Sequence, residues 1–312
     1  MVFSTEANKE THDRRMLMND NKIARRKFLK MSAAMVSSTL LYNSAQSVKA
    51  KEGKKRFLKG VKIGMLPKEL GDEEKFKLAR RCGFDGIDGT PMKDFKKARQ
   101  QAKIAREAGC PLHGLVYGWW PPFTDTTESV VQKSIDDMKN ALYCAKEINV
   151  DTVLLVPTRV TEEFGYAEAY KRSQEYVGRL IPTAEETGVV IGLENVWNKF
   201  LLSPLEFARY LDELNSKWVR AYFDIGNVII ESYAQHWIRT LGKRIIKLDV
   251  KDFKRKGYKW ENLGEGDVNW PEVRKALDEI GYSGWATAEL RGGDEAYLSD
   301  IAQRMDRLMG IK

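Results

Sequence analysis

Four acidic residues in the second half of the chain each end an apolar run that has the length of a β-strand. They are Glu194, Asp224, Asp249 and Glu289. In a parallel barrel the carboxyl ends of the strands share one rim, so the four carboxylates would meet there. Grouped like charges raise pKa values and leave some acids protonated unless a cation is present. The pattern therefore predicts a divalent metal site.

The alternation of side chains along these runs indicates that the acids point into the barrel. In the run from Val189 to Glu194, the side chains of Val189, Ile191 and Leu193 share one face, and Glu194 belongs to the other. The other three acids end runs of the same parity. Small or apolar residues thus occupy the faces that would pack under helices, and the acids occupy the inner faces.

Strand-like and helical runs alternate from residue 61 onward. The expected strands are Val61–Pro67, Phe84–Thr90, Leu112–Gly118, Thr152–Pro157, Val189–Asn195, Val219–Gly226, Ile245–Asp252 and Trp285–Leu290. The expected helices lie near 73–82, 94–109, 127–148, 168–187, 204–214, 232–241, 270–280 and 294–309. Eight such units match a single (β/α)8 barrel. A doubly wound open sheet would need a glycine-rich phosphate loop after the first strand, and 65–68 is not one.

The first fifty residues differ in character from the rest. Arg25 and Arg26, followed by a small-residue-rich apolar run over 31–41, are typical of a bacterial twin-arginine export signal. We therefore expect a signal and linker over residues 1–50, a barrel domain over 51–312, and a periplasmic or exported protein. A disordered basic tail on a cytoplasmic protein is the alternative.

Composition limits the classes of function. The formal charge of +8 falls to +3 over residues 51–312, which hold 43 basic and 40 acidic residues, so support for nucleic-acid binding is lost. No uncharged apolar stretch of about 18 residues exists, which argues against stable membrane insertion. Cys82, Cys110 and Cys144 are widely spaced, and we expect buried structural thiols. The sequence leaves the oligomeric state open, a homo-oligomer included.

Five ordered motifs carry a resemblance to a known family. They are 192–198 with Ser203-Pro204, 223–227, 250–252, 263–267 and 287–289. With them, the chain after residue 60 resembles the xylose isomerase-like barrels of sugar phosphate isomerases and epimerases. The resemblance implies a divalent metal held by acids from the fifth and sixth strands, a histidine from the seventh and a glutamate from the eighth. These positions fall on Glu194, Asp224, residue 249 and Glu289.

Two positions depart from the family pattern. Residue 249 is Asp instead of His, and Asn227 stands where some ketose epimerases place a histidine that contacts substrate. A ligand set of carboxylates favours Mn²⁺ or Mg²⁺ and still admits Co²⁺ or Zn²⁺. Four carboxylates carry excess charge, which we expect Lys247 or Lys251 to offset, because both share the parity of Asp249. The alternatives are a structural ion pair for Lys247 and a contact with Asp252 for Lys251.

A metal-bound hydroxy-ketone sugar would lose a proton next to its carbonyl, with Glu194 and Glu289 as the base and acid that the resemblance also implies. Returning the proton to the other face epimerises the sugar, and returning it to the adjacent carbon isomerises it. With a leaving group one carbon further on, the same intermediate gives a lyase or dehydratase, for example on a 3-keto-glycoside. Export favours free or oxidised sugars over phosphorylated ones. A non-catalytic sugar-binding barrel is the alternative from another class.

Further residues near the expected rim are candidates for contact with a carbohydrate, since aromatic faces at a barrel mouth stack on sugar rings. The candidates are His113, Trp119, Trp120, Trp197, Asn198, Asn227, Lys251 and Arg291. The tryptophan pair adjoins two prolines and could instead anchor a loop, and Arg291 could be an exposed loop arginine.

Overall fold

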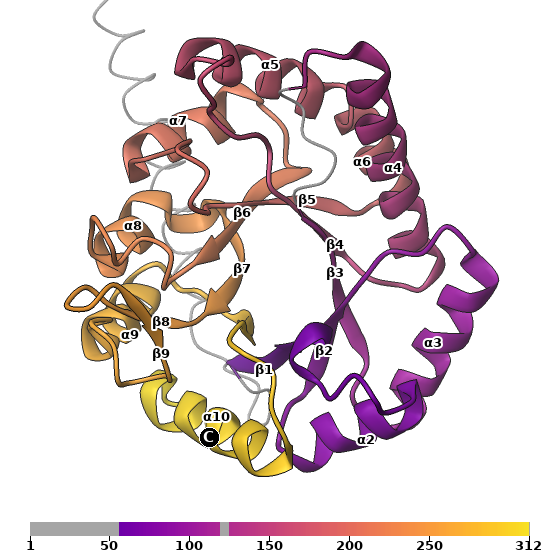
Figure 1. The fold of residues 1–312 in the computed structure, drawn as a ribbon, viewed down its shortest axis with the longest axis vertical. Helices are drawn as coiled ribbons and strands as arrows, with labels where there is room; N and C mark the ends of the chain where they lie inside the picture. The colour runs from indigo at the N-terminus through magenta and orange to yellow at the C-terminus, as the bar shows by residue number, and fades with distance from the viewer. Residues whose placement is uncertain (1–55, 119–124, 312) are drawn as a thin grey trace, which may run out of the picture. The chain divides into compact units, whose positions relative to one another are not determined.

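The structure is a computed structural model that describes residues 56–118 and 125–311. Eight parallel strands close into one barrel, with the order β1-β10-β7-β6-β5-β4-β3-β2 around the ring. The first and last barrel strands of the chain, β1 and β10, pair with each other and close the ring: Phe57 lies opposite Gly284, and Val61 lies opposite Ala288. Figure 1 shows the helices outside this ring. The expected (β/α)8 barrel is confirmed.

The helices and strands alternate along the described chain. The barrel strands are β1 (Phe57–Lys62), β2 (Gly86–Gly89), β3 (Leu112–Gly118), β4 (Thr152–Leu155), β5 (Val190–Glu194), β6 (Val219–Asp224), β7 (Ile245–Val250) and β10 (Gly284–Ala288). The helices are α2 (Asp72–Arg81), α3 (Phe95–Glu107), α4 (Glu128–Glu147), α5 (Tyr166–Gly178), α6 (Ile181–Thr187), α7 (Pro204–Glu213), α8 (Ala234–Leu241), α9 (Trp270–Glu279) and α10 (Glu295–Met309). Short 3₁₀ turns lie at Ile63–Met65 and Gly242–Arg244.

The parity of β5 is the one expected from its sequence. Ile191 and Leu193 are fully buried in the apolar core between barrel and helices. Glu194, on the other face, is buried inside the barrel. Helix α7 follows with the expected signals: the Ser203 side chain accepts a hydrogen bond from the backbone N–H of Glu206 at 3.2 Å, and Pro204 occupies the first turn.

The first strand differs from the expectation. It spans Phe57–Lys62 instead of Val61–Pro67, and a 3₁₀ turn follows it at once. The charge of Lys59 suggests an exposed segment that precedes the barrel. Its side chain is nevertheless buried, and its ammonium group lies 2.8 Å from the carboxylate of Asp306 on α10. The shift places Lys62 at the end of the strand, level with Asp88 of β2.

Two connections also differ from the expectation. The single helix expected over 168–187 is two helices, because Pro182 in the first turn of α6 has no N–H to continue α5. The seventh strand, expected over Ile245–Asp252, ends at Val250, and the connection after it contains a hairpin, β8 (Asp252–Lys254) paired antiparallel with β9 (Lys259–Glu261). In Figure 1 this hairpin lies between α9 and the barrel.

Two glycines make room for polar side chains inside the barrel. A Cβ atom on Gly60 would lie 2.4 Å from Nε2 of His113. One on Gly114 would lie 2.0 Å from Oδ1 of Asp88. Both distances are far below any van der Waals contact, so the packing of these buried polar groups requires glycine at both positions.

The three cysteines are buried and free, as expected. Within the described residues, no helix has both the length and the apolar character needed to cross a bilayer. The expected export signal and linker over 1–50 lie outside the described residues, and so does the Trp119-Trp120 pair.

Candidate metal centre

The four acids converge at the carboxyl ends of their strands. Glu194 and Asp224 are the last residues of β5 and β6, Asp249 lies on β7 directly opposite Asp224, and Glu289 follows β10. One carboxylate oxygen of each lies within 4.8 Å of one oxygen of every other. Three of the side chains are buried, and that of Glu289 is 32% exposed. We call these four residues the rim acids.

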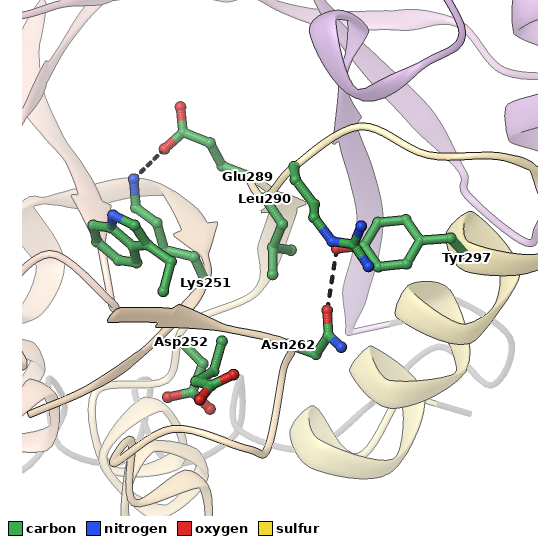
Figure 2. Close-up of a pocket in the computed structure, with 9 residues that line it drawn as sticks. Lys251, Asp252, Asn262, Glu289, Leu290 and Tyr297 are labelled. Carbon is green, nitrogen blue, oxygen red and sulfur yellow. Dashed lines mark hydrogen bonds and ion pairs between the residues drawn. The ribbon is translucent and has the colours of Figure 1, made fainter. Parts of the chain in front are cut away.

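Two lysines lie among the rim acids. The Lys251 ammonium group lies 3.0 Å from Oδ2 of Asp224 and donates to Oε2 of Glu289 at 2.6 Å, as Figure 2 shows for Glu289. On the other side, the Lys62 ammonium group lies 2.9 Å from Oδ2 of Asp249. The four carboxylates outnumber the two ammonium groups, and Lys62 also pairs with Asp88 of β2 at 3.1 Å, so an excess of negative charge remains that a divalent cation would offset.

The rim acids have few protein donors for their oxygens. Among the described residues, Oδ1 of Asp249 has no donor, and Oδ2 of Asp249 and Oδ2 of Asp224 each meet only a lysine ammonium group, at 2.9 and 3.0 Å. A buried oxygen without a donor costs free energy unless something binds it. Ligand oxygens on opposite sides of a Mg²⁺ or Ca²⁺ ion stand about 4–5 Å apart. The spacing of the carboxylates and the free oxygen of Asp249 therefore fit a hard divalent cation.

Burial and mutual repulsion raise the pKa values of three rim acids. Burial followed by repulsion from Glu289 raises the pKa of Glu194 well above its usual range. Burial raises the pKa of Asp224 to about 6 against the attraction of Lys251. Burial also raises the pKa of Asp249, although Lys62 opposes this. Glu289 is the exception: its pKa is lowered, because Lys251 and Lys62 outweigh its burial.

Neighbouring amides hold the backbone and side chain of Asp224. The side-chain amide of Asn195 donates to the carbonyl of Asp224 at 2.9 Å, and its oxygen accepts from the N–H of Asp224 at 2.9 Å. The N–H of Asn227 donates to Oδ1 of Asp224 at 2.7 Å, and its amide donates to Oε1 of Glu194 at 3.5 Å. Asn227, which we expected to contact substrate, therefore positions two of the acids.

A second buried cluster lies deeper in the barrel, and we call it the inner network. Asp88 of β2 accepts a hydrogen bond from the hydroxyl of Tyr222 at 2.5 Å and lies 3.1 Å from the Lys62 ammonium group. His113 lies 3.5 Å from the other oxygen of Asp88. Lys247 donates to the carbonyl of His113 and forms an ion pair with Asp151 at 2.8 Å. Lys62 thus lies between the inner network and the rim acids.

The inner network pairs each of its acids with a lysine, Asp88 with Lys62 and Asp151 with Lys247. Burial opposes ionisation of Asp88, but attraction to Lys62 and Lys247 outweighs it and lowers the pKa of Asp88 well below its usual range. Burial lowers the pKa of His113 to about 3, so this ring is neutral. The imidazole stacks on Trp285 with ring centroids 3.8 Å apart. The expected contact of His113 with substrate is not supported by this position, which lies inside the barrel.

The two lysines that the sequence offered as partners of the rim acids have different roles in the structure. Lys251 pairs with Asp224 and Glu289 and so offsets the charge of the rim acids, as expected for one of the two lysines. Its alternative role, a contact with Asp252, does not occur, since Asp252 accepts instead from the indole N–H of Trp270 and from backbone N–H groups. Lys247 has the structural role.

The remaining candidates lie at the barrel mouth. A pocket of about 540 Å³ opens beside Lys251 and Glu289, and Arg291 and Trp260 line it. Trp197 stacks on Trp260 with centroids 4.8 Å apart. Asn198 joins two loops, because its amide donates to the carbonyl of Thr158 after β4 and its oxygen accepts from the N–H of Phe200 in its own loop.

Sequence reasoning missed Lys62, Asp88 and Trp260. The parity argument that found the acids would also have found Asp88 in the run 84–90, where it shares the inner face. Lys62 was hidden by the misplaced first strand. Trp260 lies on a hairpin that has no clear alternation in sequence, and only the three-dimensional structure brings it to the pocket.

Known proteins resemble this chain along most of its length. The sequence profile of the xylose isomerase-like TIM barrel family matches residues 76–308. An uncharacterised protein of Methanocaldococcus jannaschii is 27% identical over 57% of this chain and 65% of its own length. The L-ribulose-5-phosphate 3-epimerase UlaE of Salmonella paratyphi A is 22% identical over 72% of this chain and 86% of its own length.

Solved structures show the same fold. A D-tagatose 3-epimerase-like protein superposes with a TM-score of 0.70 at 19% identity, over 81% of this chain and 98% of its own. The 3-keto-D-glucoside 4-epimerase YcjR of E. coli superposes with a TM-score of 0.69 at 17% identity, over 82% and 100%.

Proposed function

Because this chain belongs to the xylose isomerase-like TIM barrel family, we propose that it is a divalent-metal-dependent sugar epimerase or isomerase. The observation that carries the proposal is the convergence of four carboxylates that outnumber the nearby lysines. The relative UlaE is by name a sugar phosphate epimerase, which supports carbohydrate as the substrate class. The pocket beside Glu289 has equal numbers of solvent-accessible cationic and anionic side chains, which gives a phosphate no net attraction.

Two of the rim acids would have a second role beside metal binding. All four would hold the cation, which when bound supplies a positive charge that polarises the carbonyl of the substrate. Glu194 and Glu289 come from β5 and the end of β10, two strands that are not neighbours in the barrel. A sugar bound between them would present one face of its reacting carbon to each glutamate. One carboxylate then removes the proton and the other returns it to the opposite face, which is epimerisation.

The contacts of Glu289 and Glu194 support their roles as base and acid. Lys251 donates to Glu289 at 2.6 Å and holds it as a carboxylate, the form that a base requires. Asn227 fixes the position of Glu194 from the other side. Glu289 is the most exposed of the four acids and lines the pocket, so substrate reaches it first.

Exchange of a carbon-bound proton with solvent tests the proposal. The Mn²⁺-loaded protein is incubated in D₂O with a panel of ketoses, aldoses and 3-keto-glycosides, and deuterium incorporation is followed by NMR. Glu194→Gln and Glu289→Gln should each lower exchange by about 10²–10⁴-fold, the usual contribution of a positioned acid or base. Glu279→Gln, an exposed helix residue paired with Arg239, is the control and should exchange at the wild-type rate. Wild-type exchange in both site variants would exclude this pair.

A lyase is the second candidate, and the pocket beside Glu289 is the observation that favours it. That pocket has room for a group attached to the sugar, which the same proton abstraction would expel from a 3-keto-glycoside. The D₂O experiment separates the two outcomes, because a lyase releases the attached group, whereas an epimerase returns a deuterated isomer.

We also propose export through the twin-arginine pathway, on the basis of Arg25 and Arg26. Fractionation of cells that express the full chain tests it. The wild-type protein should appear in the periplasm, and a variant with lysine at both positions should stay in the cytoplasm. Equal distribution of the two proteins would contradict the proposal.

A further inference from the structure

The pocket next to the rim acids extends away from the barrel axis. It is bounded by the β8–β9 hairpin, by the segment after β10 and by the first turn of α10. Figure 2 shows Lys251 and Glu289 at one side of it and Tyr297 with Asn262 at the other. The hydroxyl of Tyr297 donates to Oδ1 of Asn262 at 3.2 Å, which ties α10 to the segment that follows the hairpin. The far wall of the pocket is therefore held in place by a hydrogen bond between two elements.

Trp260 gives this pocket an aromatic wall. Its side chain is 45% exposed, which is unusual for so large an apolar group. Trp197 stacks on it with an interplanar angle of 22°, and the Lys251 ammonium group lies 5.0 Å from its ring centroid. These contacts fix the indole, and a fixed aromatic surface binds the C–H face of a sugar ring at little entropic cost.

The charges of the pocket give no net attraction to an anionic ligand. Lys251 and Arg291 are its cations and Glu261 and Glu289 are its anions, whereas the carboxylate of Asp252 is buried and accepts hydrogen bonds from Trp270 and from backbone N–H groups. A phosphate would gain from the two cations but would meet two carboxylates, and like charges brought together are costly. Donors on Arg291 and acceptors on Glu261 and Asn262 suit neutral hydroxyl groups, which both donate and accept hydrogen bonds.

We infer that this pocket is a subsite for the second, uncharged ring of a glycoside, with Trp260 as the stacking surface. The inference rests on the proposed function, since it assigns the reacting sugar to the rim acids and the attached ring to the pocket. The volume of about 540 Å³ lies in the range of pockets that enclose ligands larger than a single sugar. The substrate class is thus a neutral glycoside or disaccharide, in contrast to a phosphorylated monosaccharide.

Binding without turnover tests the inference separately from the chemistry. Affinities of the full-length, Mn²⁺-loaded protein are measured by calorimetry for cellobiose, maltose, D-glucose and D-glucose 6-phosphate. At least one disaccharide should bind about tenfold more tightly than glucose, and the phosphate ester should bind no more tightly than glucose. Tightest binding of glucose 6-phosphate, or equal binding of glucose and both disaccharides, would overturn the inference. Neither binding result depends on proton exchange. The calorimetry therefore tests the subsite, and the D₂O experiment separately tests the proposed function.

Variants of the hairpin then locate the subsite. Trp260→Ala should weaken disaccharide binding by about tenfold and leave glucose binding unchanged, and Trp260→Phe should retain part of the preference. Tyr233→Ala is the control, because Tyr233 is an exposed aromatic directly before α8 that does not line the pocket. It should bind the disaccharide like the wild type. An unchanged disaccharide affinity in Trp260→Ala, or an equal loss in Tyr233→Ala, would contradict the assignment.

Discussion

The rim acids and the inner network are both buried clusters of charge in one barrel, yet the pKa of Asp88 moves in the opposite direction to those of three of the four rim acids. In the inner network, the pKa of Asp88 is lowered, since Lys62 and Lys247 outweigh its burial. At the rim, burial and repulsion raise the pKa values of Glu194 and Asp249. The two clusters lie next to each other and share Lys62.

The difference separates a structural cluster from a functional one. A buried carboxylate whose charge is neutralised by neighbouring lysines has a lowered pKa and needs no metal ion, although Oδ1 of Asp88 accepts no hydrogen bond among the described residues. A group of carboxylates that outnumber their lysines has raised pKa values, which is the arrangement that a metal ion completes. Burial alone does not distinguish these cases, because Asp88 and Asp249 are equally buried.

The same substitution should have opposite effects on stability in the two clusters, and the larger effect is expected for the inner network. Asp88→Asn leaves Lys62 and Lys247 with less compensation, and removing one partner of a buried ion pair costs about 3–5 kcal/mol. Urea unfolding of the metal-free protein at pH 8 measures this loss. Asp278→Asn, which breaks an exposed pair with Arg56, is the control and should cost no more than about 1 kcal/mol. If Asp88→Asn loses no more free energy of unfolding than the control, the proposed difference between the two clusters is wrong.

At the rim, Asp224→Asn should stabilise the metal-free protein at pH 8 by about 1–3 kcal/mol. Its pKa of about 6 against an ordinary value of 3.8 means that the ionised form is disfavoured when folded. The amide can still accept the N–H of Asn227. The same unfolding experiment gives the sign, and stabilisation by Mn²⁺ should vanish in the variant. If the metal-free variant is less stable than the wild type, Asp224 has a structural role like that of Asp88.

Stabilisation by metal should grow with pH. Between about pH 4 and 6 the folded, metal-free protein binds more protons at Asp224 than the unfolded chain, so this contribution to stability falls as pH rises through about 6. The difference in Tm between samples with Mn²⁺ and with chelator should therefore be small at pH 5. At pH 8, with metal at 100 times its Kd, it should reach about 5–10 °C. His113 titrates equally in both samples, so its effect cancels. A difference independent of pH would contradict metal binding by these acids.

The smallest expected effect concerns metal choice. Asp249→His replaces a hard oxygen ligand by nitrogen and should shift the preference from Mn²⁺ toward Zn²⁺ or Co²⁺ by about tenfold. Competition of the ions for the purified variant measures it, with Asp278→Asn as the unshifted control. An unchanged preference would mean that Asp249 serves only as the partner of Lys62.

Much of the site could be predicted because parity and strand order fix where a strand-terminal side chain points. Glu194, Asp224 and Asp249 follow this logic, and Leu112–Gly118 agrees with β3 at both ends. The failures have physical causes. Lys59 is charged but buried through its pair with Asp306, so the first strand was displaced in sequence and Lys62 went unnoticed. The pocket depends on a hairpin and on α10, which the sequence does not place beside each other.

The metal content of the purified protein tests the central claim most directly. After loading with Mn²⁺ and exhaustive dialysis, elemental analysis should find about one equivalent of metal per wild-type chain. It should find less than about a tenth of an equivalent in a double variant with Asp224→Asn and Glu289→Gln, and full occupancy in the Asp278→Asn control. A wild-type protein without metal under these conditions would contradict the account, and so would equal occupancy in the double variant.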